Sequence, residues 1–237
     1  MIQYETRGAV AVVVIDRPER RNALDHEALD GLEQAIATAQ ADACRVIVLS
    51  GADGHFCAGA DLSGVEDTDF VQTLRRVLLG LHRAQVPTIA AVEGAALGAG
   101  TQLAVACDLR VACHDAQFGI PAAKLGLMVD EWTIRRLAQV AGEAPARAML
   151  LAAEVYSGQA AHAFGMVQRL GQPSSALDWA EQIAQLAPLT IEGHKLGLNH
   201  ANRAEYEAAF ARAWSSEDLK EGMAAFRERR RASFRGR

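Results

Sequence analysis

The stretch EGAALGAGTQLAVACDLRVA, residues 93–112, joins a glycine-rich loop to a long apolar run. This pattern predicts a loop, then a helix from about Gly98 to Ala106, then a strand over residues 108–113. Small residues around a helix start place little bulk near its first N–H groups, which have no partner inside the helix. The helix carries Gln102 but no acidic or basic side chain. The stretch therefore predicts a site at which backbone N–H groups, and not a side chain that carries a proton, contact a ligand.

Strands and helices alternate with short connections on both sides of this stretch. Two β-rich runs around Gly8 indicate a hairpin, and later apolar runs that end at glycine or proline indicate buried strands. The expected strands span residues 2–8, 9–16, 45–51, 88–92 and 165–171. Asp25 is expected to cap a helix that ends near Gln40. Further helices are expected over residues 69–83, 130–142, 143–154 and 175–188. Such alternation is typical of an α/β fold with mainly parallel strands.

The C-terminal part of the chain lacks strand signals and is helical in pattern. From Thr190 onward the sequence predicts helix throughout, and Ser215 with Asp218 three residues later resembles a capping box at the last helix. No linker or repeat interrupts the chain. We therefore expect an α/β core over residues 1–187 and a helical C-terminal region over residues 188–237.

Bulk composition excludes several classes of function. A net charge of −5 gives no support to binding of nucleic acid or another polyanion. No apolar run approaches the roughly 20 residues that a transmembrane segment needs, and the N-terminal sequence lacks the basic start of a signal peptide. The four cysteines lack metal-ligand spacing, so we expect free thiols in a reducing, cytoplasmic environment. We expect no metal and no covalently bound cofactor.

Two loops each place small residues around one backbone N–H group. In FCAGADL, residues 56–62, Gly59 and small neighbours surround the backbone N–H of Ala60. In LGAGTQL, residues 97–103, small residues surround the N–H of Ala99 at the expected helix start. Two such N–H groups that converge on one point form an oxyanion hole for a carbonyl oxygen. Taken alone, each loop is better explained by tight packing.

Four segments together are more specific than either loop, namely RPERRNAL (17–24), FCAGADL, VEGAALGAGTQLAVACDLRVA (92–112) and FGIPAAKLGL (118–127). Their order and spacing closely resemble the enoyl-CoA hydratase/isomerase, or crotonase, superfamily, and within it hydratase-like paralogues of actinobacteria. The resemblance covers nearly the whole chain and is weakest in the C-terminal region. It implies a crotonase-like spiral of ββα turns, followed by a helical region that forms a homotrimer or a dimer of trimers.

The resemblance also implies a ligand, an acyl-CoA thioester. By position, the N–H groups of Ala60 and Ala99 would form the oxyanion hole. Arg21 is a candidate for contact with the CoA phosphates, although a solvated surface arginine explains this residue equally well. The positions that would contact coenzyme A are Arg21, Ala58, Asp61 and Leu62.

Both proton carriers of the family's hydratases are missing at the corresponding positions. Gln102 replaces the first glutamate, and Ala122, which follows Pro121, replaces the second. General acid–base catalysis is typically worth about 10²–10⁴-fold in rate. The sequence therefore predicts a protein of lipid metabolism that binds acyl-CoA, expected to be fatty acyl-CoA, with weak or no hydratase activity.

An alternative is an enoyl-CoA isomerase or another reaction of this superfamily. Asp130 resembles in position the acting aspartate of dienoyl-CoA isomerases, and Glu131 follows it directly. A simpler interpretation is that one of these acids caps the helix that begins there, where acids suit the helix dipole. Trp132 is expected either to line the acyl pocket or to pack in the core with its N–H satisfied.

Other candidates carry less weight. Cys57 lies beside the glycine of the first loop and is more simply explained as a packing residue than as a reactive thiol. The seven histidines show no paired ligand spacing, which argues against a metal site. The run RERRRASFRGR, residues 227–237, holds six arginines and is expected to be a solvated tail. The resemblance offers one alternative, contact of this tail with the CoA of a neighbouring subunit.

Overall fold

The computed structural model describes residues 1–61, 68–199 and 201–237. Its centre is a six-stranded sheet in the order β1-β2-β3-β4-β6-β9. β1 and β2 form an antiparallel hairpin around Gly8, and the other neighbouring strands run parallel. The sheet consists of β1 (Ile2–Arg7), β2 (Val10–Ile15), β3 (Val46–Gly51), β4 (Thr88–Val92), β6 (Leu109–Ala112) and β9 (Arg169–Leu170). The predicted hairpin and the mainly parallel core are confirmed.

A second, three-stranded sheet is not predicted by the sequence. It consists of β5 (Ala95–Leu97), β7 (Gln117–Gly119) and β8 (Val155–Ser157), in the order β5-β7-β8. Strands this short do not show the alternation of apolar and polar residues that marks a longer strand. β5 lies inside the glycine-rich stretch, so this small sheet fixes the loop that leads into α3 (Ala99–Ala106).

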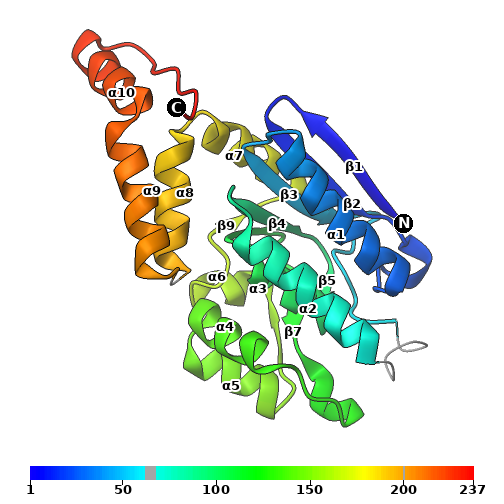
Figure 1. Cartoon of the computed structure of the whole chain (residues 1–237). Coiled ribbons are helices and arrows are strands. Elements are labelled where there is room, and N and C mark those ends of the chain that lie inside the picture. The colour runs from blue at the N-terminus through cyan, green and yellow to red at the C-terminus, as the bar shows by residue number, and fades with distance from the viewer. Residues whose placement is uncertain (62–67, 200) are drawn as a thin grey trace.

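Helices cover both faces of the large sheet (Figure 1). α1 (His26–Ala41) and α2 (Thr68–Arg83) pack together on one face, while α7 (Pro173–Ala184) packs on the other against β3, β4 and β6. Along β2, Ala11 and Val13 belong to the first core, and Val10 and Val12 belong to the second. This alternation follows from the period of two in a strand, and it explains why the central strands are apolar on both sides.

The other helices complete the core and form the C-terminal region. They are α4 (Glu131–Ala141), α5 (Glu143–Leu151), α6 (Gly158–Ala163), α8 (Pro188–Leu198), α9 (Arg203–Ser215) and α10 (Glu217–Glu228). Asp25 caps α1 as predicted, because its side chain accepts a hydrogen bond from the N–H of Ala28. Across the described ranges, no helix is both long and apolar enough to cross a membrane.

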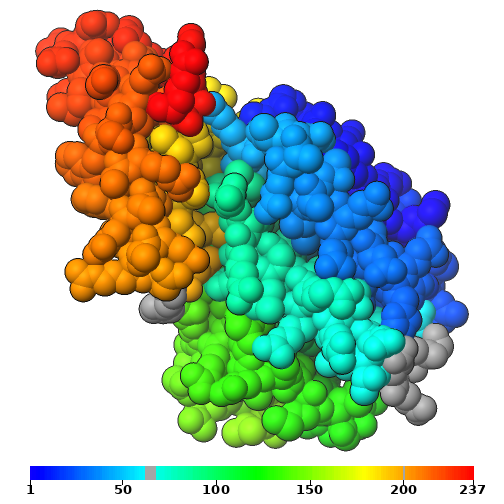
Figure 2. All heavy atoms as spheres, in the orientation of Figure 1, coloured from blue at the N-terminus to red at the C-terminus, as the bar shows by residue number. Residues whose placement is uncertain are grey.

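The C-terminal helices form a lobe at one side of the molecule, coloured orange and red in Figure 2. α8, α9 and α10 are helical as predicted, but residues 229–237 are not, which corrects the prediction of helix to the end of the chain. α10 ends where Arg229 adopts a left-handed conformation, and the tail then returns to the start of α10. There the N–H groups of Arg235 and Gly236 donate to the carboxylate of Asp218 at 2.7 and 2.8 Å.

The cap of α10 differs from the prediction by one residue. Ser216, and not Ser215, accepts the hydrogen bond from the N–H of Leu219. Ser215 ends α9 and donates its hydroxyl to the carbonyl of Ala211. Because the carboxylate of Asp218 binds the tail, it is not available to complete the predicted capping box.

Cations from three elements close the C-terminal end of α3. Arg110 of β6 is fully buried and donates to four main-chain carbonyl oxygens at 2.7 to 3.0 Å, those of Ala104, Cys107, Asp108 and Met166. Arg136 of α4 donates to the carbonyl of Val105. Lys195 of α8 pairs with the Asp108 carboxylate at 2.7 Å and joins the C-terminal region to the core. Carbonyls at a helix C-terminus carry partial negative charge, so the two arginines, which donate to the Ala104 and Val105 carbonyls, stabilise α3.

His82, beside this cluster, is expected to make the fold sensitive to acid. Its Nδ1 is shut off from solvent without a hydrogen-bond partner in the part of the chain that is described. Burial, together with the nearby charge of Arg136, lowers the pKa of His82 from 6.5 to about 4. Between these two pH values the unfolded chain binds a proton that the folded chain rejects, so stability falls as the pH falls through this window.

Urea unfolding at pH 7 and at pH 4.5 measures this loss. His82→Phe keeps a ring against Trp132, which lies 5.4 Å away between centroids, and removes the titrating group. The variant should therefore lose less stability between the two pH values than the parent protein. An equal loss in both proteins would show that another group causes the acid sensitivity.

Candidate functional site

The two glycine-containing loops pack directly against each other. The N–H of Cys57 donates to the carbonyl of Ala95 at 2.8 Å, and the N–H of Leu97 donates to the carbonyl of Cys57 at 3.0 Å. A Cβ atom on Gly100 would collide with the carbonyl oxygen of Cys57, so only glycine permits this close approach of α3. Segments that are far apart in the sequence therefore meet at one site.

The N–H groups of Ala60 and Ala99 are left without an acceptor at this site. Neither donates a hydrogen bond to any described residue, whereas the neighbouring N–H groups of Ala58, Asp61 and Gly98 all bond to main-chain oxygens. Ala99 is the first residue of α3, so its N–H lies at the positive end of the helix dipole. Both residues line the same cavity. The two amides are thus placed as candidate donors to one ligand oxygen.

A cavity of about 280 Å³ opens in front of these amides. Its walls come from the two loops, from α2 and from the segment that connects β7 to α4. Most lining side chains are apolar, and they include Phe70, Val71, Leu74, Leu78, Leu97, Ile120, Pro121, Ala122, Leu125, Leu127, Met128 and Val129. Met128 is 87% exposed, so the apolar wall extends to the mouth of the cavity. This lining suits an apolar ligand with a polar end.

Three residues form a connected polar group at the cavity. The Thr133 hydroxyl donates to Oε1 of Gln102 at 3.1 Å, and the Thr133 N–H donates to Oδ1 of Asp130 at 2.7 Å. Asp130 thereby caps α4, as the simpler interpretation of this residue expects, and it also lines the cavity. Arg75 of α2 lies 3.9 Å from the Asp130 carboxylate and lines the cavity as well. No motif in the sequence marks Thr133 or Arg75 as a site residue.

Two predicted residues lie away from the cavity lining. Glu131 is exposed and pairs with Arg135, one turn along α4, at 2.6 Å. Trp132 is half-buried and packs its ring edge-on against His82. Trp132 thus packs against the core, and neither of these side chains lines the cavity.

The residues expected to contact coenzyme A gather beside the Ala60 loop. The N–H of Ala58 donates to the carbonyl of Arg21 at 3.0 Å, which holds the turn at Arg21 against this loop. Arg21 is exposed, and Asp61 is half-buried with a carboxylate oxygen 3.4 Å from the guanidinium of Arg17. Leu62 falls outside the described residues.

The cysteines are not placed for chemistry. Cys57 is fully buried behind the first loop, and burial raises the pKa of its thiol to about 12. Because the thiolate is the reactive form, this thiol is inert near neutral pH, which supports the packing interpretation. All four cysteines are free and buried. Among the described residues, no three potential ligands are grouped to hold a metal ion.

Fold and site together define a class, an α/β protein that presents two unbonded backbone amides to an apolar cavity. The family model for enoyl-CoA hydratase/isomerase matches residues 5–237. The chain is 42% identical over 245 residues to "Probable enoyl-CoA hydratase echA6" of Mycobacterium tuberculosis, with 100% of both chains covered. It is 32% identical to the mitochondrial methylglutaconyl-CoA hydratase of Mus musculus, with 99% of this chain and 82% of the relative covered.

The fold agrees with a solved structure of the same kind. The crystal structure of an enoyl-CoA hydratase/carnithine racemase from Magnetospirillum magneticum matches with a TM-score of 0.92 and 29% identity, covering 100% of this chain and 96% of that chain. The chain therefore belongs to the enoyl-CoA hydratase/isomerase family and has its crotonase fold. Homologues in this family act on CoA thioesters.

Proposed function

We propose that this protein binds fatty acyl-CoA and hydrates enoyl-CoA weakly or not at all. The observation that supports this most strongly is the combination of the unbonded amides of Ala60 and Ala99 with Gln102 and Ala122 at one cavity. The amides suit a thioester carbonyl. Gln102 and Ala122 offer no group that takes or gives a proton near neutral pH.

In this proposal the thioester oxygen accepts hydrogen bonds from both amides. The positive end of the α3 dipole favours the partial negative charge on that oxygen. The acyl chain lies along the apolar wall from α2 and the segment before α4, where each buried methylene contributes about 0.8 kcal/mol. Coenzyme A extends over Ala58 and Asp61 toward the guanidinium of Arg21.

Hydration of an enoyl thioester requires a base for the water and an acid for C2. The amide of Gln102 has no useful proton affinity, and its Oε1 already accepts from Thr133. Ala122 presents only a methyl group to the cavity. The two backbone amides polarise the carbonyl, but they move no proton, so the ligand is bound and left largely unchanged.

Calorimetric titration with hexadecanoyl-CoA tests the binding function, and we expect a dissociation constant in the micromolar range or below. Ala122→Phe fills the cavity and should weaken binding by about tenfold or more, a loss of at least about 1.4 kcal/mol. Ala123→Phe changes the exposed neighbour, which does not line the cavity, and should bind like the parent. No heat of binding in the parent, or equal binding by both variants, would contradict the proposal.

A second candidate function is double-bond isomerisation with Asp130 as the base, because this residue lines the cavity. Asparagine caps a helix about as well as aspartate, so Asp130→Asn removes the base and keeps the cap of α4. Turnover of an unsaturated acyl-CoA that collapses in this variant would support the isomerase. Turnover that is unchanged in Asp130→Asn would show that Asp130 is not the base.

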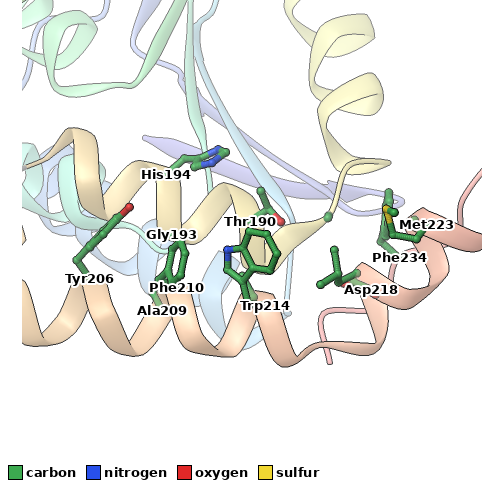
Figure 3. A pocket seen from close by; sticks show the side chains of 14 residues that line it. Thr190, Gly193, His194, Tyr206, Ala209, Phe210, Trp214, Asp218, Met223 and Phe234 are labelled. Carbon is green, nitrogen blue, oxygen red and sulfur yellow. The ribbon is translucent and has the colours of Figure 1, made fainter. Parts of the chain in front are cut away.

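We further propose that α8, α9 and α10 mediate assembly into a homotrimer or a dimer of trimers. A groove of about 450 Å³ lies among these helices and the tail. Figure 3 shows Tyr206, Phe210 and Trp214 in a row along α9, and these side chains are 40%, 51% and 64% exposed. An exposed apolar row of this kind favours contact with another surface. Analytical ultracentrifugation tests this, since a monomer mass at micromolar concentration would contradict it.

A further inference from the structure

The side-chain amide of Gln102 has one bonded end and one free end. Gln102 is 8% exposed, and its Oε1 accepts from the Thr133 hydroxyl at 3.1 Å. Its Nε2 makes no hydrogen bond to any described residue. The only side-chain nitrogen or oxygen in the described residues that is both sealed from solvent and unbonded is Nδ1 of His82. Nε2 of Gln102 is unbonded but is not one of the sealed atoms, so it is accessible to solvent or ligand. The opening that Gln102 lines is the cavity.

Thr133 determines which end of the amide faces the cavity. Its side chain is fully buried, and its hydroxyl proton has no other acceptor among the described residues. A hydroxyl donates one proton, so the group that faces it is the oxygen of the Gln102 amide. The N–H of Thr133 is fixed in turn by the carboxylate of Asp130 at 2.7 Å. The NH₂ group of Gln102 is thus presented to the cavity as a donor.

The position of this donor along α3 relates it to the thioester site. Gln102 lies three residues after Ala99, which places it about 4.5 Å further along the helix axis and on the same side. Both residues line one cavity, so an acyl chain that leaves the Ala99 amide along α3 would bring C3 close to Gln102. The cavity lining also includes Ile120 and Ala122, which are apolar. A plain methylene at C3 would leave the NH₂ group desolvated and unpaired.

We propose that the site selects acyl-CoA thioesters that carry an oxygen on C3, as a 3-oxo or 3-hydroxy group, and that the NH₂ group of Gln102 donates to this oxygen. The inference rests on the proposed thioester-binding function and adds the substrate class. Gln102 contacts the ligand in this scheme, and Thr133 is a positioning residue that orients the amide. No bond is made or broken, because the interaction is a hydrogen bond from a neutral donor.

Calorimetric titration with three CoA thioesters of sixteen-carbon chains tests the inference, with hexadecanoyl-CoA, 3-hydroxyhexadecanoyl-CoA and 3-oxohexadecanoyl-CoA as probes. The parent protein should bind at least one of the 3-oxygenated thioesters about tenfold more tightly than the saturated one. In Gln102→Leu the ratio of the two dissociation constants, for the saturated and the 3-oxygenated thioester, should fall to about one. The matched control Gln182→Leu replaces an exposed glutamine of α7 and should keep the full preference.

Two variants of Thr133 separate positioning from general packing. Thr133→Val removes the hydroxyl at nearly constant volume and should reduce the preference, because the amide is no longer held in one orientation. Thr133→Ser retains the hydroxyl and should retain the preference. Equal affinity of the parent for all three thioesters would overturn this inference and leave the thioester site intact. Failure of all three to bind would overturn the proposed function as well.

Discussion

The double variant Gln102→Glu/Ala122→Glu is expected to hydrate crotonyl-CoA at least about 100-fold faster than the parent protein. In the proposed function, two amides of the parent polarise the thioester carbonyl, while Gln102 and Ala122 offer no group that transfers a proton. Both altered positions line the cavity, so the new carboxyl groups would reach the ligand. The Thr133 hydroxyl would donate to a carboxylate at position 102 as it donates to Gln102 now. The apolar wall would raise the pKa of the new acids toward neutrality.

A matched control places the second carboxylate outside the cavity. Gln102→Glu/Ala123→Glu has the same composition and charge, but position 123 is exposed and does not line the cavity. The hydration rate of this control should remain within about tenfold of the rate of the parent, because the control supplies one proton carrier and not two. The ultraviolet absorbance of the enoyl thioester gives the rate directly. No gain in a double variant that still binds crotonyl-CoA would contradict the view that only proton carriers are missing.

Arg110→Met is expected to lower the free energy of unfolding by on the order of 4 kcal/mol. The guanidinium donates to four main-chain carbonyls, and methionine would remove all four hydrogen bonds. The Cys107 and Met166 carbonyls would keep the longer bonds from Arg136 and Gln168, at 3.4 and 3.2 Å, while those of Ala104 and Asp108 would lose their side-chain donor. Burial lowers the pKa of Arg110 to about 10, so the side chain remains charged at neutral pH. The loss would be concentrated at the C-terminal end of α3, the helix whose first residue is Ala99. Melting of α3 would also remove the Ala99 amide from the thioester site.

Arg135→Met is the matched control for this stability measurement. Arg135 is 78% exposed and pairs with Glu131 one turn away on α4. An exposed pair with this spacing contributes about 0.3–0.5 kcal/mol, so the control should unfold almost like the parent. Urea denaturation of both variants at pH 7 gives the comparison. A similar small loss of unfolding free energy in both variants would show that the carbonyls at the C-terminal end of α3 do not need Arg110 as a hydrogen-bond donor.

The elements that could be predicted from the sequence depend on neighbours along the chain. Gly8 marks the hairpin, and Asp25 marks the start of α1, because a turn and a cap are local features. The buried central strands are recognisable as short apolar runs that end at glycine or proline. The site amides of Ala60 and Ala99 were predicted by resemblance, and the structure leaves both without a bonded partner in the described part of the chain.

The features that could not be predicted depend on contacts between distant segments. Thr133 meets Gln102 only because α4 packs against α3, and no motif around Thr133 signals this contact. Asp218 binds the amides of the tail, which the sequence pattern describes as helix or solvated chain. Glu131 and Asp130 are adjacent in sequence, yet the start of α4 directs only Asp130 to the cavity. Which of two neighbouring acids faces a ligand is decided by the helix start.

Isotope-edited infrared spectroscopy of an acyl-CoA labelled with ¹³C at the thioester carbonyl tests the central claim most directly. Two backbone amides that hold the oxygen should lower the carbonyl stretching frequency of the bound ligand below its value in water. Ala99→Pro removes one donor at the first position of a helix, where proline is tolerated, and should lose a large part of this shift, while Ala99→Gly should keep it. A bound carbonyl with the frequency that it has in water, or one that Ala99→Pro leaves unchanged, would contradict the account.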